Sequence, residues 1–120
     1  MTLKSVNPYT EEIIRRYKSH TFAYCKKRIE KARKRFESWK KISAKKRAWH
    51  TRRVSNVLKN NKEKYSKLIT LETGKPIRES LAEVEKCIWL CEYYSHHGPR
   101  FLKGRKVKVR YYKKSYVRYE

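Results

Sequence analysis

The sequence has 120 residues, the length of one small domain. It holds 34 Lys and Arg against 11 acidic residues, a formal net charge of +23, and such charge opposes compaction unless an anionic partner relieves it. No apolar run spans a bilayer and the N-terminus lacks the apolar core of a signal peptide, so we expect a soluble protein without a membrane partner. The cysteines form no disulfide framework, which predicts the reducing cytoplasm.

The positive charge is concentrated in two blocks. Residues 15–67 hold 21 Lys and Arg against three Glu, and residues 100–118 hold nine with no acid. Between them, residues 68–99 hold three Lys and Arg against five Glu. This asymmetry favours an anion-binding surface over general solubility.

The first 18 residues predict a β-hairpin. Residues 3–6 alternate apolar and polar side chains, as a half-exposed strand does. Asn7-Pro8 is a turn signal, and residues 12–17 can return as the second strand.

Residues 21–41 predict an amphipathic helix that Thr21 or Ser19 can cap. Most of its polar positions are Lys or Arg, although like charges three and four residues apart oppose helix formation. A solvated face usually mixes its signs, so we expect this face to contact phosphate groups. The apolar face recurs at helical spacing and consists of Phe22, Cys25, Ile29, Ala32, Phe36 and Trp39.

Two more helices follow, and Asn60-Asn61 is expected to separate them. Ser43 can cap the first, whose apolar face is weakened by His50 and Thr51. Gly74 is expected to end the second in the left-handed conformation.

A fourth helix is predicted at residues 77–97, with its end at residues 96–99, His-His-Gly-Pro. Residues 105–119 predict two strands about a short turn, whose tyrosines either pack or offer platforms for unpaired bases. The fold class is therefore α+β and mainly helical. We expect a single small domain, 1–120, with a hairpin at 1–18, three to four helices at 21–97, and a hairpin or extended strands at 105–120.

Motifs for other chemistry are weak. Gly74-Lys75-Pro76 lacks the upstream glycine and the following Ser or Thr of a phosphate-binding loop. The spacing of Cys87, Cys91 and the two histidines at 96–97 matches no common zinc pattern, so we expect no metal site. No known RNA-binding module is recognisable either.

Several segments resemble one family. Residues 68–94, above all the Glu-Thr-Gly-Lys-Pro run at 72–76, resemble the N-terminal region of aldehyde dehydrogenases, particularly the succinate-semialdehyde dehydrogenase branch. Residues 5–8 are similar to the opening hairpin of that family, residues 32–39 to its first long helix, and residues 114–120 to the segment before its cofactor-binding core. The resemblance covers the chain from end to end.

The same resemblance implies no chemistry for residues 1–120. The family's nucleotide-binding lysine and asparagine, its catalytic glutamate and its nucleophilic cysteine correspond to positions downstream of this sequence. Cys25, Cys87 and Cys91 match none of them, and Cys87 is expected to be a packing residue. The family has a mixed, Glu-rich surface where this chain has Lys and Arg. We therefore expect a protein that is not an enzyme and binds no cofactor and no small-molecule substrate.

Three functional hypotheses follow. The first is a structural RNA-binding protein of the cytoplasmic ribosome, with rRNA and neighbouring ribosomal proteins as partners. The second is a DNA-binding, chromatin-like protein, and the third is a non-catalytic partner subunit of an aldehyde dehydrogenase. For the first, the predicted nucleic-acid contacts are Lys26, Lys27, Lys34, Arg35, Lys45, Lys46, Arg52, Arg53, Arg105, Lys106, Lys108 and Arg110.

Overall fold

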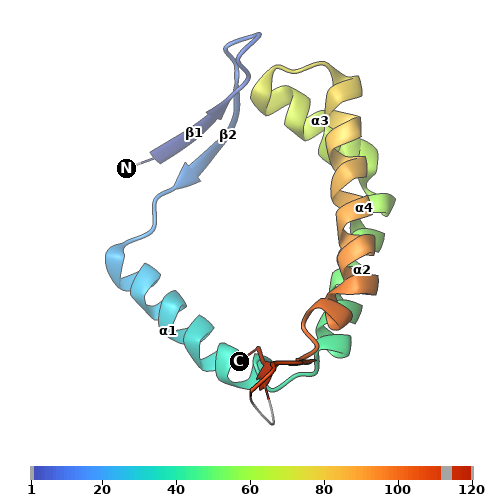
Figure 1. The fold of residues 1–120 in the computed structure, drawn as a ribbon. Helices are drawn as coiled ribbons and strands as arrows, with labels where there is room; N and C mark the ends of the chain where they lie inside the picture. The colour runs from blue at the N-terminus through green and yellow to red at the C-terminus, as the bar shows by residue number, and fades with distance from the viewer. Residues whose placement is uncertain (1, 112–114, 120) are drawn as a thin grey trace.

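The computed structural model describes residues 2–111 and 115–119. As predicted, the fold is mainly helical, with a strand pair near each end of the chain (Figure 1). The elements in order are β1 (Thr2–Val6), β2 (Ile13–Lys18), α1 (Phe22–Trp39), α2 (Ala44–Asn60), α3 (Lys62–Thr73), α4 (Ile77–Phe101), β3 (Arg105–Val107) and β4 (Ser115–Val117).

The N-terminal hairpin is confirmed, and its turn is built on Asn7. Strands β1 and β2 are antiparallel, with a register shift after Ser5. The Oδ1 atom of Asn7 accepts a hydrogen bond from the backbone N–H of Tyr9 at 2.9 Å, and the N–H of Asn7 donates to the carbonyl of Glu12 at 2.9 Å. Glu11 takes the left-handed conformation, with φ of 60°. The asparagine side chain thus replaces a backbone partner in the turn.

The predicted helix caps are confirmed. Thr21 accepts a hydrogen bond from the N–H of Tyr24 at 3.2 Å, and Ser43 accepts one from Lys46 at 3.3 Å. Gly74 ends α3 with φ of 73°, in the left-handed conformation. This conformation is unfavourable for a residue that carries a Cβ atom.

The predicted end of α4 is wrong, because the helix continues past Pro99. Proline lacks an N–H, so it removes one bond, the one to the carbonyl of Ser95. The following turn still closes, since the N–H of Leu102 donates to the carbonyl of Gly98 at 3.1 Å. A proline in the last turn therefore does not end this helix.

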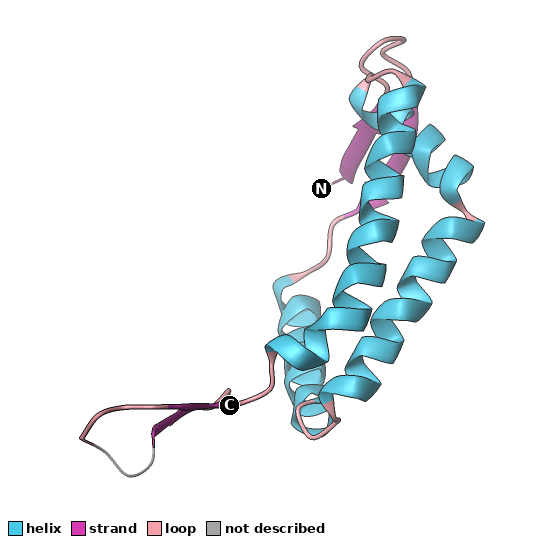
Figure 2. Ribbon diagram, turned by 45° about the vertical axis from the view of Figure 1, so that its right-hand side comes forward, coloured by secondary structure: helices cyan, strands magenta, loops and turns pink. Residues whose placement is uncertain are grey.

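Helices α2, α3 and α4 form the packed part of the molecule, with α2 and α4 side by side along most of their length (Figure 2). Small residues let the helices approach closely. The Ser66 hydroxyl donates to the carbonyl of Lys62 at 2.8 Å, and the hydroxyls of Thr70 and Ser80 lie 2.8 Å apart. Internal bonds of this kind satisfy the buried hydroxyls. The buried side chains are Ala48, Val84, Ile88, Ser55, Ser66 and Ser80.

Helix α1 lies apart from this packed part, across an open space in Figure 1. None of its 18 residues is buried. The rings of Trp39 on α1 and His50 on α2 are 5.3 Å apart and join the two helices near their corner. The radius of gyration is 21.0 Å, against about 14 Å for a compact chain of this length. These residues therefore leave much apolar surface without a neighbour, and the expectation of one independent domain stays a prediction.

The C-terminal strands are shorter than predicted and project from the helices (Figure 2). Strands β3 and β4 are antiparallel, and Arg105 pairs with Val117. Tyr111 and Tyr116 are 86% and 64% exposed, so they do not pack within the part of the chain that the structure describes. The predicted turn residues 113–114 lie outside the described residues. Among the helices described, none combines the length and apolarity needed to cross a membrane.

Candidate functional site

All twelve predicted contact residues are exposed, but they belong to separate surfaces. Four lie on α1, four on α2, two on β3 and two in the segment that follows it. Sequence reasoning thus identified exposed cations, and their role in binding stays a prediction.

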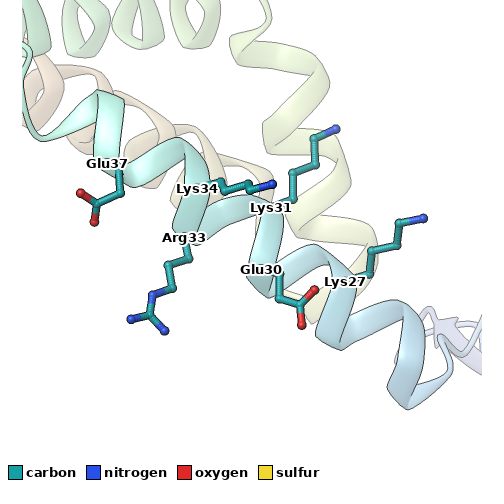
Figure 3. Close-up of a pocket in the computed structure, with 6 residues that line it drawn as sticks. All are labelled: Lys27, Glu30, Lys31, Arg33, Lys34 and Glu37. Atoms are coloured by element: carbon teal, nitrogen blue, oxygen red, sulfur yellow. The ribbon is translucent and has the colours of Figure 1, made fainter.

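Two of them, Lys27 and Lys34, border an open hollow of about 660 Å³ beside α1 (Figure 3). The side chains of Lys27, Lys31 and Lys34 extend to the same side of the helix, whereas Arg33 and Glu37 extend to the other. The hollow is lined by Lys27, Glu30, Lys31, Arg33, Lys34 and Glu37. Because one helix supplies all of these residues, the hollow is a charged groove and not an enclosed pocket for a small molecule.

Lys45 and Arg52 come together in a second hollow, of about 470 Å³, between α2 and α4. Trp49 forms part of its wall, together with Pro99 from α4. The guanidinium of Arg53 lies 4.9 Å from the centre of the Trp49 ring, a cation–π arrangement. Arg53 is therefore partly engaged within the protein.

Ion pairs fasten α4 to the helices beside it. Lys59 donates to the carboxylate of Glu92, which lowers the pKa of that carboxyl although burial opposes the shift; Ser55 also donates to it, at 3.3 Å. Lys62 donates to Glu85 at 2.8 Å, and this hydrogen bond raises the pKa of Lys62. Satisfied pairs of this kind point to a structural role for these carboxylates.

Cys91 shows no sign of activation. Burial raises the pKa of the Cys91 thiol, and the nearby Cys87 adds to the shift. A raised pKa disfavours the reactive thiolate. Cys87 is exposed, so the expectation that it packs is wrong within this chain. No group of three metal-ligating side chains occurs among residues 2–111 and 115–119.

The profile of the aldehyde dehydrogenase family matches residues 1–120, the whole sequence. The chain belongs to the aldehyde dehydrogenase family. It is 26% identical over 85% of its length to the probable succinate-semialdehyde dehydrogenase (NADP+) of Synechocystis, and 31% identical over 88% to the succinate-semialdehyde dehydrogenase (NADP+) of Deinococcus radiodurans. It spans 22% of the length of each of these relatives.

A solved aldehyde dehydrogenase shows the same fold. The succinic semialdehyde dehydrogenase of Streptococcus pyogenes, solved with NADP+, superposes with a TM-score of 0.86 at 24% identity, over 94% of this chain and 25% of that one. The open arrangement of α1 relative to α2–α4 is therefore a feature of the family fold. The resemblance inferred from the sequence is confirmed.

Family membership corrects the predicted function. The expected ribosomal RNA-binding protein, with rRNA and ribosomal proteins as partners, is wrong, because the chain matches a family of dehydrogenases throughout. The inference rested on charge, which is a surface property that one fold can carry without a change of activity.

The expectation that the protein is not an enzyme and has no small-molecule substrate is also wrong, since the relatives are enzymes named for aldehyde substrates. That expectation rested on catalytic residues missing from 1–120. The matched region is about a fifth of the length of a relative. The lack of catalytic residues in residues 1–120 therefore says nothing about catalytic residues that lie in the other parts of the family fold.

Sequence reasoning missed the contacts that position the elements. Ser5 on β1 donates to Glu72 on α3 at 2.8 Å, and Trp39 meets His50. Both pairs join residues of different elements. No periodicity within one element signals such a pair.

Proposed function

We propose that residues 1–120 form the N-terminal part of an NAD(P)+-dependent dehydrogenase of a small carboxylate-bearing semialdehyde, with succinate semialdehyde as the first candidate. The observation that carries the proposal is the family match over the whole chain. The substrate class is supported by the two relatives above, both named succinate-semialdehyde dehydrogenases.

In this proposal residues 1–120 support the catalytic centre and do not react. Two features give no support to a dinucleotide site: the hollow beside α1 comes from one helix, and Gly74-Lys75-Pro76 has no phosphate-loop pattern. What they offer is apolar surface. Ile29 and Phe36 on α1 are 68% and 55% exposed, and such surface needs a covering neighbour. In this proposal the remainder of the family fold packs between α1 and α4 and covers this surface.

A second candidate is a non-catalytic partner subunit of an aldehyde dehydrogenase. The chain spans 22% of its relatives, and its uncovered apolar faces can pack on a separate chain as well as on a continuation of its own. In this case the apolar faces would pack as they do in the family fold, and the partner chain would carry the catalytic residues.

One experiment separates the two candidates. The native polypeptide that contains residues 1–120 is purified and assayed for NADH and NADPH formation with succinate semialdehyde, glutarate semialdehyde and propanal. Activity in a homogeneous single polypeptide supports the first proposal. Activity that co-purifies only with a distinct dehydrogenase supports the second. A polypeptide with neither activity nor a bound dehydrogenase contradicts both.

Location in the cytoplasm is part of the same proposal. Cys25, Cys87 and Cys91 are free thiols in the structure, as a reducing compartment favours. The family match gives no support to the ribosome as the site of action.

A further inference from the structure

Helix α1 carries an unusual load of unpaired charge. Its 18 residues include seven Lys and Arg and only two Glu. Glu37 pairs with Lys40, which follows the helix, at 2.5 Å. Within the described residues, none of the seven cations forms a salt bridge. Their mutual repulsion costs stability that a polyanionic surface can offset.

Three of the cations share one side of α1, away from its apolar residues, whereas Arg33 extends to the other side. Phe22, Ile29 and Phe36 recur every seven residues and mark the apolar side, which the proposed function assigns to the rest of the fold. Lys27, Lys31 and Lys34 recur at spacings of four and three, so they share another side, as Figure 3 shows. At about 1.5 Å per residue, α1 is a rod about 27 Å long. Lys27 and Lys34 are seven residues apart, so the three ammonium groups form a straight strip about 10 Å long on this rod.

We propose that the strip of Lys27, Lys31 and Lys34 docks the protein on an anionic phospholipid surface. A straight strip of one sign suits a flat, negatively charged surface, which attracts basic segments without a defined partner geometry. Lysine suits this contact because its flexible apolar stem lets the ammonium group reach separate headgroups. A specific protein interface, by contrast, centres on apolar and aromatic side chains, which these three positions lack.

This inference goes beyond the proposed dehydrogenase activity, and it rests on the proposed function only for the side of α1 that the rest of the fold covers. It also departs from the expectation of no membrane partner, which rested on the lack of a bilayer-spanning run and of a signal-peptide core. The protein would lie on the membrane surface, held by charge, and its attachment would weaken as salt screens the headgroups.

The test is vesicle co-sedimentation of the full polypeptide at physiological salt, without substrate. Vesicles of phosphatidylcholine mixed with phosphatidylserine are compared with vesicles of phosphatidylcholine alone. We expect binding to the anionic vesicles only, and a loss of at least about tenfold in affinity for the triple variant Lys27→Glu, Lys31→Glu, Lys34→Glu. A Lys→Gln version at the same positions should bind with intermediate affinity, and it keeps the test informative if the Glu version does not fold.

The matched control reverses three exposed lysines elsewhere, Lys64→Glu, Lys67→Glu and Lys86→Glu, on α3 and α4. Both triple variants change the net charge equally, so only location differs. Retained binding by the control supports the strip. Equal losses in the two variants, equal binding to neutral vesicles, or displacement from anionic vesicles by RNA at lower phosphate concentration would overturn the proposal.

Discussion

The hydroxyl of Ser5 donates a hydrogen bond of 2.8 Å to the carboxylate of Glu72, 67 residues away in the chain. The pair ties the first strand of the N-terminal hairpin to the last turn of α3. Close by, a Cβ atom on Gly74 would lie 3.0 Å from Cγ of Pro8, so the hairpin turn rests against the end of α3. These two contacts set where the hairpin lies on the helical part.

Removing the Ser5–Glu72 bond should loosen the hairpin without unfolding the helices. Because the pair is exposed, we expect Ser5→Ala and Glu72→Ala each to cost about 0.5–1 kcal/mol of unfolding free energy. The double variant should cost less than the sum of the two, since both changes remove the same bond. Urea denaturation of the four proteins measures the coupling. Thr10→Ala removes only the two bonds that Thr10 makes with Glu12 within the turn, so it should add to Glu72→Ala without coupling.

Gly74→Ala should destabilise the protein by about 1–2 kcal/mol, because alanine pays for the left-handed conformation that glycine adopts freely. The close approach of Pro8 adds to this cost. Gly98→Ala is the matched control: it lies inside α4, and apart from its chain neighbours nothing lies within 4 Å of an added Cβ atom. The gain in helix propensity, about 1 kcal/mol, is offset in part by the crowding of a Cβ atom against Pro99, so the net change should be smaller than that of Gly74→Ala. Thermal unfolding measures both, and equal effects of one sign would contradict the argument.

Local signals in the sequence predicted most of the elements. Asn7-Pro8 indicates the hairpin turn, and Thr21 and Ser43 the starts of two helices, because their side chains bond the backbone two or three residues away. Gly74 indicates the end of a third helix, because glycine adopts the left-handed conformation freely. Pro99 misled the prediction, since its effect depends on how near the end of a helix it stands.

The packing and the function were less accessible. Ser55, Ser66 and Ser80 are fully buried. Apolar periodicity cannot identify them, because they are polar residues that are buried at helix contacts where a small side chain is needed. The twelve candidate cations were identified correctly as exposed, but exposure and charge do not name a partner. The conclusion about chemistry needed the family match, because the resemblance assigns none of the family's reacting groups to residues 1–120.

The Lys59–Glu92 pair should make stability depend on pH in the acid range. Lys59 lowers the pKa of Glu92 below its ordinary value of 4.5, so the carboxylate stabilises the fold above that value, and the contribution is lost as the pH falls through the lower folded-state pKa. Glu92→Gln should remove this part of the loss of stability at acid pH. Unfolding midpoints from neutral pH down to acid measure the effect. Glu30→Gln, at an exposed carboxylate of α1 outside the ion pairs named, is the control for the loss of one carboxyl group.

His50 should control how firmly α1 is held at its corner with α2. Its ring lies 5.3 Å from Trp39 on α1 and 4.9 Å from Trp49 on its own helix. An aromatic contact contributes about 0.5–1.5 kcal/mol, so His50→Ala should speed amide hydrogen exchange in the C-terminal half of α1 by up to about tenfold, with α3 and α4 unaffected. His97→Ala is the control, because that ring contacts Tyr93 and Phe101 within α4. Unchanged exchange in α1 of the His50 variant would mean that contacts with the rest of the enzyme fold hold α1 without help from this corner.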